Sequence, residues 1–190
     1  MAINTLYMDR EVLKKAREVY EHQNPKNIRL EQFFQPAVFA LLQKKIFSAA
    51  YRLHFDPKKW KYEGAKVEEM QSFLAGGYFK NIVGAILGLK KFRLSFEVRK
   101  FSPGSYTLLH DAEKEQAGID VIIDCSLLPR NNSGCVKYLT IKEELLQLDP
   151  SPNTLSFVER KKGVMRYVKY VNHQQSPIIL VMGTIFKKKP

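Results

Sequence analysis

The side chains best suited to chemistry in this sequence are those that commonly ligate metals or act as bases and nucleophiles: His22, His54, Cys125, His110, Cys135 and His173. The two cysteines form neither a C-x-x-C pair nor, together with the histidines, the spacing of a structural zinc site. No glycine-rich phosphate loop, G-x-S-x-G motif or nucleophile–base spacing is present. These absences argue against a zinc-binding fold and a serine hydrolase. In a cytosolic protein of this size, two buried or strand-edge thiols are favoured over a disulfide.

Basic side chains gather at three other places. Arg160, Lys161, Arg166 and Lys169 form an anion-binding patch or, equally well, a solvated strand face and turn. The segment Lys58-Lys59-Trp60 is a basic–aromatic cluster that suits either a partner or simple surface packing. A third basic run, between 90 and 100, alternates with aromatic residues, and strand periodicity turns those aromatics inward, away from any nucleic-acid base.

The elements that must position these side chains change character halfway along the chain. Apolar spacing predicts a short helix from Arg10 to the Asn24-Pro25 break, and a longer helix from Pro36 whose apolar face continues to Leu53. A third helical stretch from Lys66 is interrupted at Gly76-Gly77. From Lys91 the period changes to two, and further strands are predicted at Phe92–Arg99, Tyr106–His110, Asp120–Leu127, Cys135–Ile141, Thr154–Phe157, Val164–Val171 and Pro177–Phe186.

This order of elements predicts an α+β fold, with N-terminal helices packed on a sandwich or jelly roll. The 190 residues, of which 45% are hydrophobic, are enough for one core. We therefore expect a single domain, 1–190, with a helical support region at 1–90 and a β core at 91–190.

The segment Phe101–Asp111 resembles a known family when it is taken with this architecture. In the non-haem Fe(II), 2-oxoglutarate-dependent dioxygenases of the prolyl 4-hydroxylase type, particularly the branch that acts on ribosomal prolines, a glycine precedes the first metal histidine by six residues, as Gly104 precedes His110. Similar passages follow at Ser133–Tyr138, Leu148–Pro150 and Asn153–Phe157. The resemblance implies a double-stranded β-helix (a cupin-like jelly roll), with Fe(II) and 2-oxoglutarate as the cofactors if the chain is active.

The metal triad that the resemblance implies is incomplete. His110 fits the first ligand, but Ala112 stands where the carboxylate is expected, and Asp111 points to the opposite face of a regular strand. Arg166 stands in place of the second histidine, and a guanidinium has no lone pair to offer a metal. The arginine that holds 2-oxoglutarate is replaced by Ile178. A local bend at Asp111 would leave an atypical metal pair, His110 and Asp111.

Charge indicates the class of partner. The chain has 31 Lys and Arg against 19 Asp and Glu, which gives a net charge of +12. Such a balance favours RNA, a ribonucleoprotein or an acidic protein. No apolar run reaches the ~20 residues of a membrane span, and no secretory signal is visible, so we expect a cytoplasmic protein, with a nuclear one not excluded.

Three interpretations follow. The first, which we favour, is a catalytically degenerate relative whose basic surface binds one of these anionic partners. The second is an active Fe(II)/2-oxoglutarate-dependent prolyl hydroxylase that uses His110 and Asp111. The third is an interaction domain or homo-oligomer in which the N-terminal helices form the docking face.

Overall fold

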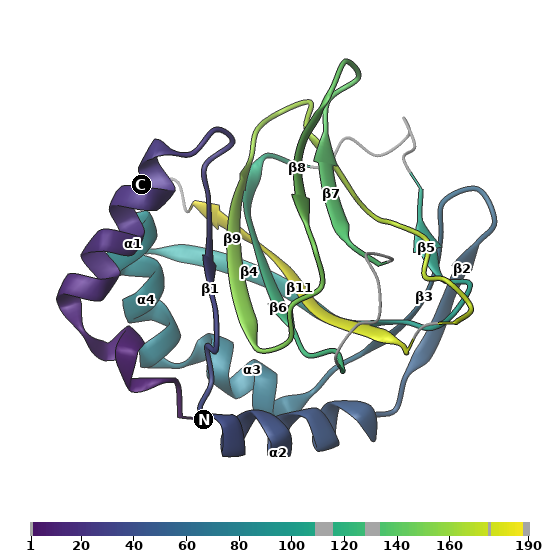
Figure 1. The fold of residues 1–190 in the computed structure, drawn as a ribbon, viewed down its shortest axis with the longest axis horizontal. Helices are drawn as coiled ribbons and strands as arrows, with labels where there is room; N and C mark the ends of the chain where they lie inside the picture. Colours follow the sequence, from purple (N-terminus) through teal and green to yellow (C-terminus); the bar gives the residue numbers. More distant parts are fainter. Residues whose placement is uncertain (1, 109–115, 128–133, 175, 188–190) are drawn as a thin grey trace.

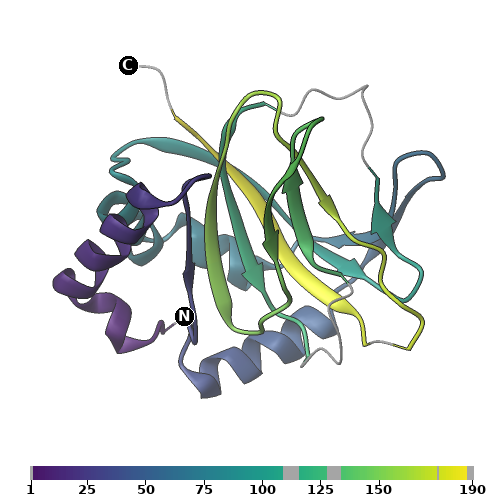
Figure 2. The ribbon, with the colours of Figure 1, turned by 45° about the horizontal axis from the view of Figure 1, so that its top comes forward.

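Two antiparallel sheets face each other across an apolar core, and helices cover the outer face of the larger sheet. Figure 1 shows the computed structural model, which describes residues 2–108, 116–127, 134–174 and 176–187. The large sheet has the order β1-β9-β6-β11-β4-β3-β2, with β5 paired to β3, and the small sheet has the order β10-β7-β8. Figure 2 shows the small sheet as a separate layer. This arrangement is the predicted α+β jelly roll.

The strands of the large sheet are β1 (Asn27–Leu30), β2 (Arg52–Asp56), β3 (Trp60–Ala65), β4 (Phe92–Phe101), β5 (Tyr106–Thr107), β6 (Gly118–Asp124), β9 (Thr154–Arg160) and β11 (Ile178–Lys187). Those of the small sheet are β7 (Val136–Leu139), β8 (Glu144–Leu148) and β10 (Met165–Val168). A 3-10 turn, η1 (Thr5–Met8), precedes the helices α1 (Arg10–His22), α2 (Pro36–Phe47), α3 (Glu68–Ala75) and α4 (Gly77–Leu87).

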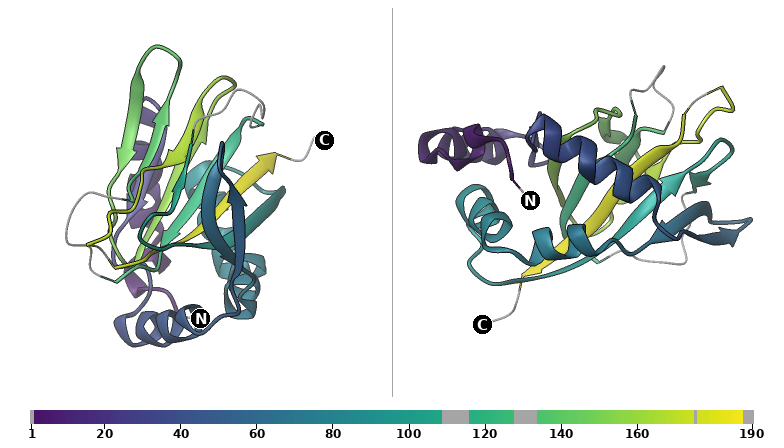
Figure 3. Two further views of the ribbon diagram at one scale, coloured as in Figure 1. Left: turned by 90° about the vertical axis from the view of Figure 1, so that its right-hand side faces the viewer. Right: turned by 90° about the horizontal axis from the view of Figure 1, so that it is seen from below.

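The large sheet has a different core on each face because successive strand residues point to opposite sides. On β6, Val121 and Ile123 face the helices and belong to the first core, whereas Ile122 faces the small sheet and belongs to the second core. The helices lie on the side turned away from the small sheet (Figure 3). Asp120 shares the face of Ile122 and therefore lies between the sheets.

The helical start of the chain follows from its capping residues. The Asp9 side chain accepts the Glu11 N–H at 2.7 Å and begins α1, as a good N-cap residue does. Gly76 ends α3 and begins α4, which confirms the interruption that the glycine pair predicts.

The helix that was predicted to continue to Leu53 ends at Phe47 instead. The Ser48 N–H bonds back to the Lys44 carbonyl and completes the last turn. The chain then forms β2, which pairs with β3 as a hairpin, and Leu53 is 64% exposed on it. The apolar spacing up to Leu53 was thus wrongly assigned to a helix face. The region 1–90 contributes three strands to the large sheet as well as its helices.

Both cysteines are buried and free, which confirms the preferred interpretation of two unpaired thiols. Burial raises the pKa of the Cys125 thiol well above its usual value. None of the described helices has the length and apolar character that crossing a bilayer requires.

Candidate functional site

The predicted metal pair cannot be placed. His110 and Asp111, like Ala112, lie outside the described residues, so their role stays a prediction. Within the described ranges, no three side chains of His, Cys, Asp or Glu are grouped so that they could hold a metal ion. In the described part of the jelly-roll interior, a cluster of charged side chains surrounds Asp120.

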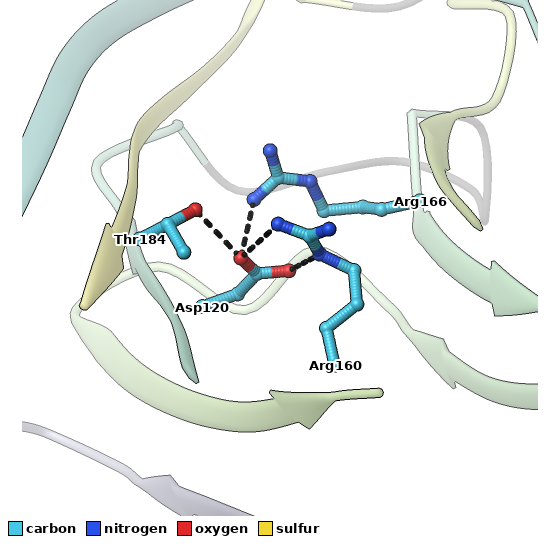
Figure 4. Close-up of polar contacts among 4 residues, drawn as sticks. All are labelled: Asp120, Arg160, Arg166 and Thr184. Carbon is cyan, nitrogen blue, oxygen red and sulfur yellow. Dashed lines mark hydrogen bonds and ion pairs between the residues drawn. The ribbon is translucent and has the colours of Figure 1, made fainter. Parts of the chain in front are cut away.

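Asp120 is the centre of a buried polar cluster between the two sheets (Figure 4). Its side chain is fully buried, and one carboxylate oxygen accepts the Thr184 hydroxyl at 2.8 Å. Arg160 donates through Nε at 2.9 Å and through Nη2 at 3.2 Å, one bond to each carboxylate oxygen. Arg166 brings Nη1 to 3.2 Å from the same oxygen that Thr184 reaches.

Strand pairing explains why these four residues meet. Asp120 lies opposite Thr184 on β11 and opposite Val158 on β9, so that Arg160, two residues after Val158, points to the same face. The chain turns after β9 and returns as β10 in the small sheet, where Arg166 faces the interior. Three strands of one sheet and one strand of the other therefore define the cluster.

The cluster keeps Asp120 charged. Burial by itself raises the pKa of this carboxyl, but the charge of Arg166 and the hydrogen bonds from Arg160 and Thr184 outweigh it, so the pKa lies below its ordinary value. The fully buried phenol of Tyr138, on β7, also lies near this carboxylate. Burial and the Asp120 charge raise the pKa of Tyr138, which stays protonated.

Two described positions that the resemblance assigns to Fe(II) and 2-oxoglutarate carry side chains that do not suit these groups. Arg166, where the resemblance implies a histidine ligand, holds a guanidinium against Asp120 and cannot coordinate a metal. Ile178, where the resemblance implies an arginine, is 1% exposed in the second core. It packs so closely on Gly134 that a Cβ there would lie 2.6 Å from its Cγ1. An apolar contact thus occupies the place of a carboxylate anchor.

The remaining predicted site residues lie apart from one another. Arg160 is 3% exposed and belongs to the cluster, whereas Lys161 is exposed in the turn after β9. Lys169 is also exposed, just beyond β10. Lys58 and Lys59 lie at the β2–β3 turn, a region separate from the Asp120 cluster. Lys59 Nζ is 5.2 Å from the centroid of the Trp60 ring, and Trp60 packs against the second core.

Asp120 is the residue that the sequence did not reveal as functional. The available signal was an acid at a mid-strand position of β6 with apolar residues on either side, since such a group needs a buried partner. The partners lie 40 and 64 residues away along the chain, so only the strand pairing brings them together.

A groove lies beside the cluster, on the face of the large sheet that is turned toward the small one. Its volume is about 740 Å³, and charged groups of both signs line it: Arg93, Glu97, Arg99 and Arg166. Glu97 is held by Arg99, whose Nε lies 2.9 Å from it, while the Arg99 guanidinium stacks over the Tyr62 ring at 4.6 Å. Three arginines against one glutamate make this groove basic.

Solved structures with the same fold are 2-oxoglutarate oxygenases. A prolyl hydroxylase from Trichoplax adhaerens, solved with a hypoxia-inducible-factor peptide, has a TM-score of 0.68 at 10% identity and matches 96% of this chain and 92% of its own. A Pseudomonas putida prolyl-4-hydroxylase has a TM-score of 0.66 at 12% identity, with 93% and 99% covered. The predicted double-stranded β-helix is therefore confirmed, and at such identities the likeness establishes the fold alone.

Sequence comparison points to a narrower set of relatives. Prolyl 3-hydroxylase OGFOD1 of Mus musculus is 33% identical over 82 residues, which is 41% of this chain and 15% of that protein. The Xenopus laevis protein is 33% identical over 86 residues, 42% of this chain and 17% of its own length. This chain thus matches less than a fifth of either relative. No family model matches the sequence.

Proposed function

We propose that this chain is a non-catalytic module with the fold of a 2-oxoglutarate oxygenase, and that its basic surface binds an anionic partner. The observation that carries the proposal is the pairing of Arg166 with Asp120. A buried cation at the place where the resemblance implies a metal ligand repels a metal ion, and its ion pair engages the buried carboxylate of Asp120.

The surroundings of the cluster support the same conclusion. The interior brings two guanidinium groups against Asp120, and the adjoining groove adds Arg93 and Arg99. With a net charge of +12 for the chain, the long-range field attracts anions. RNA, a ribonucleoprotein and an acidic protein all carry the required charge.

The competing hypothesis is an active Fe(II)/2-oxoglutarate-dependent prolyl hydroxylase with His110 and Asp111 as ligands. The names of the OGFOD1 relatives favour it, as does the fold of the solved neighbours. It requires a metal site that works without a second histidine and without an arginine for the cosubstrate.

Metal analysis separates the two hypotheses. The purified full chain is titrated with Mn(II) in place of Fe(II) by calorimetry, and 2-oxoglutarate turnover is assayed with added Fe(II). We expect no binding at micromolar concentration and no turnover. Micromolar metal binding together with turnover that His110→Ala abolishes would establish the hydroxylase instead.

A second measurement tests the anionic partner. Because phosphate neutralisation releases counterions, RNA affinity must fall steeply as salt rises. Binding of a single-stranded RNA that is equally tight at low and high salt, or absent at low salt, would remove RNA from the proposal.

A further inference from the structure

The first six residues of strand β4 have an open edge. β11 pairs with β4 along its whole length, from Phe92 to Phe101. On the other side, β3 pairs only with Val98–Lys100, because its last residue is Ala65 and the chain then turns away into α3. Within the ranges that the structure describes, no strand or loop backbone hydrogen bond reaches this edge over 92–97. Unpaired N–H and C=O groups of such an edge can accept another strand.

Side-chain burial agrees with an open edge. Leu94 and Phe96 face the helices, as Val98 does, yet they are only half-buried, whereas Val98 and Ile185 are 0% and 1% exposed. These apolar residues share one face of the sheet but differ in burial, because Leu94 and Phe96 have no neighbouring strand on the open side. The edge is thus accessible from the side.

The basic groove runs along the same stretch of β4. On the face toward the small sheet, Arg93 and Ser95 are exposed and line the groove. The Arg93 guanidinium lies 5.3 Å from the centroid of the Phe186 ring and forms no ion pair with a described residue. A strand added at this edge would turn every second side chain toward the face that carries this arginine.

We propose that an extended acidic segment of a partner protein adds to the open edge of β4 at Phe92–Glu97, with alternate Asp or Glu side chains toward Arg93 and the basic groove. This inference rests on the proposed binding function and names the class of partner. Backbone hydrogen bonds supply affinity in this mode, and side chains at alternate positions supply specificity.

The same edge does not suit nucleic acid. The aromatic residues of this stretch, Phe92 and Phe96, pack against the helical core, so they offer no face for base stacking. A phosphate backbone also lacks the N–H donors that complete a sheet ladder. An acidic peptide satisfies both the charge of the groove and the edge.

The test uses the full chain and a short fluorescein-labelled peptide of alternating Glu and Thr, followed by fluorescence anisotropy. We expect it to bind at least about tenfold more tightly than a Lys–Thr peptide, since like charge at an interface is unfavourable. Two peptides are compared, one N-methylated at the odd-numbered amides and one at the even-numbered amides. One should bind about tenfold more weakly and the other almost unchanged, because only every second peptide N–H points toward β4. Hydrogen exchange should slow at 92–97 when the peptide is bound.

Matched variants place the site. Arg93→Glu should weaken the acidic peptide about tenfold or more, whereas Lys15→Glu, an equal charge change at an exposed position of α1, should leave its affinity within about twofold. Both residues are exposed, so neither change should disturb folding, and circular dichroism checks this.

Three results would overturn strand addition: no binding of the acidic peptide, binding that ignores N-methylation, or tighter binding of an oligouridylate that Arg93→Glu weakens. Failure here differs from failure of the proposed function. Peptide binding by a chain that also turns over 2-oxoglutarate leaves strand addition standing and refutes the non-catalytic module. A chain that is inactive and does not bind the peptide refutes strand addition and leaves the non-catalytic module standing.

Discussion

Replacing Asp120 by asparagine tests the central cluster directly. The amide keeps the shape of the carboxylate but removes the negative charge that pairs with Arg160 and Arg166. Removing one partner of a buried ion pair typically destabilises a protein by about 3–5 kcal/mol, because the remaining charge stays buried. Asp120 is fully buried and both arginines are at most 9% exposed, so solvent screens little of this effect.

The expected loss is a large part of the total stability. A domain is commonly stable by about 5–15 kcal/mol, and at this chain length each kcal/mol shifts the melting temperature by about 2–4 °C. Asp120→Asn should therefore lower the melting temperature by roughly 6–20 °C. Urea unfolding monitored by circular dichroism and by the fluorescence of the only tryptophan, Trp60, measures the loss.

The control is an exposed ion pair. Glu21→Gln removes the pair in which Arg17 Nε lies 2.8 Å from Glu21, with both side chains nearly half exposed, and the urea midpoint should barely move. If Asp120→Asn shifts the midpoint no more than this control does, the electrostatic account of the cluster is refuted. Replacing Asp120, Arg160 and Arg166 together by Leu, Met and Met should be less harmful than Asp120→Asn, since no charge of this cluster is then left buried without its partner.

Four further outcomes are expected. The pKa of Asp120 is lower in the folded than in the unfolded chain, so its stabilisation is complete above its unfolded pKa of about 3.9 and is lost as the pH falls through the folded pKa. At pH values below about 4, the urea midpoint of the wild type should therefore decrease, and that of Asp120→Asn should decrease less. Arg166→His should be destabilised less at pH 5 than at pH 8 relative to wild type, because a histidine beside this carboxylate has a raised pKa and is protonated only at the lower pH. Gly183→Ala should cost about 1–3 kcal/mol in urea unfolding, since its Cβ would lie 2.8 Å from a carbonyl oxygen of β4. The Asn153 side chain bonds to both the N–H and the carbonyl of Phe34, and both variants Asn153→Ala and Asn153→Gly lose these bonds. Because the backbone of residue 153 has φ 61°, Asn153→Ala should destabilise the protein more than Asn153→Gly, by about 1 kcal/mol of backbone strain.

Periodicity predicted the β half because it reflects burial on one face. In Phe92–Arg99 the apolar residues all point to the helical core, as the alternation required. The same logic failed at β2, where Leu53 continued the helical spacing by chance and only pairing with β3 decides the structure. The strand β8 was also missed, because Glu144–Leu148 has no clear alternation.

The cluster could be predicted only in part. The position of Arg166 and its conflict with metal binding follow from the resemblance and from the chemistry of a guanidinium. Its counter-charge could not be deduced, since Asp120 meets Arg160 through the β6–β9 pairing and meets Arg166 through the packing of one sheet on the other. Neither contact can be predicted from the residues next to Asp120 in the sequence.

The charge balance of the interior limits which ligands it can accept. At an effective dielectric constant of 20, two unit charges 4 Å apart interact with about 4 kcal/mol, so a divalent cation beside Arg166 would be repelled by roughly twice that amount. Asp120 is already shared between two guanidinium groups and gives such a cation little compensation. An anion at the same place would instead be attracted by Arg166 and by Arg93 and Arg99 in the groove. Under the proposed function, these charges disfavour a metal ion and favour a carboxylate, so an acidic segment is the first partner to test.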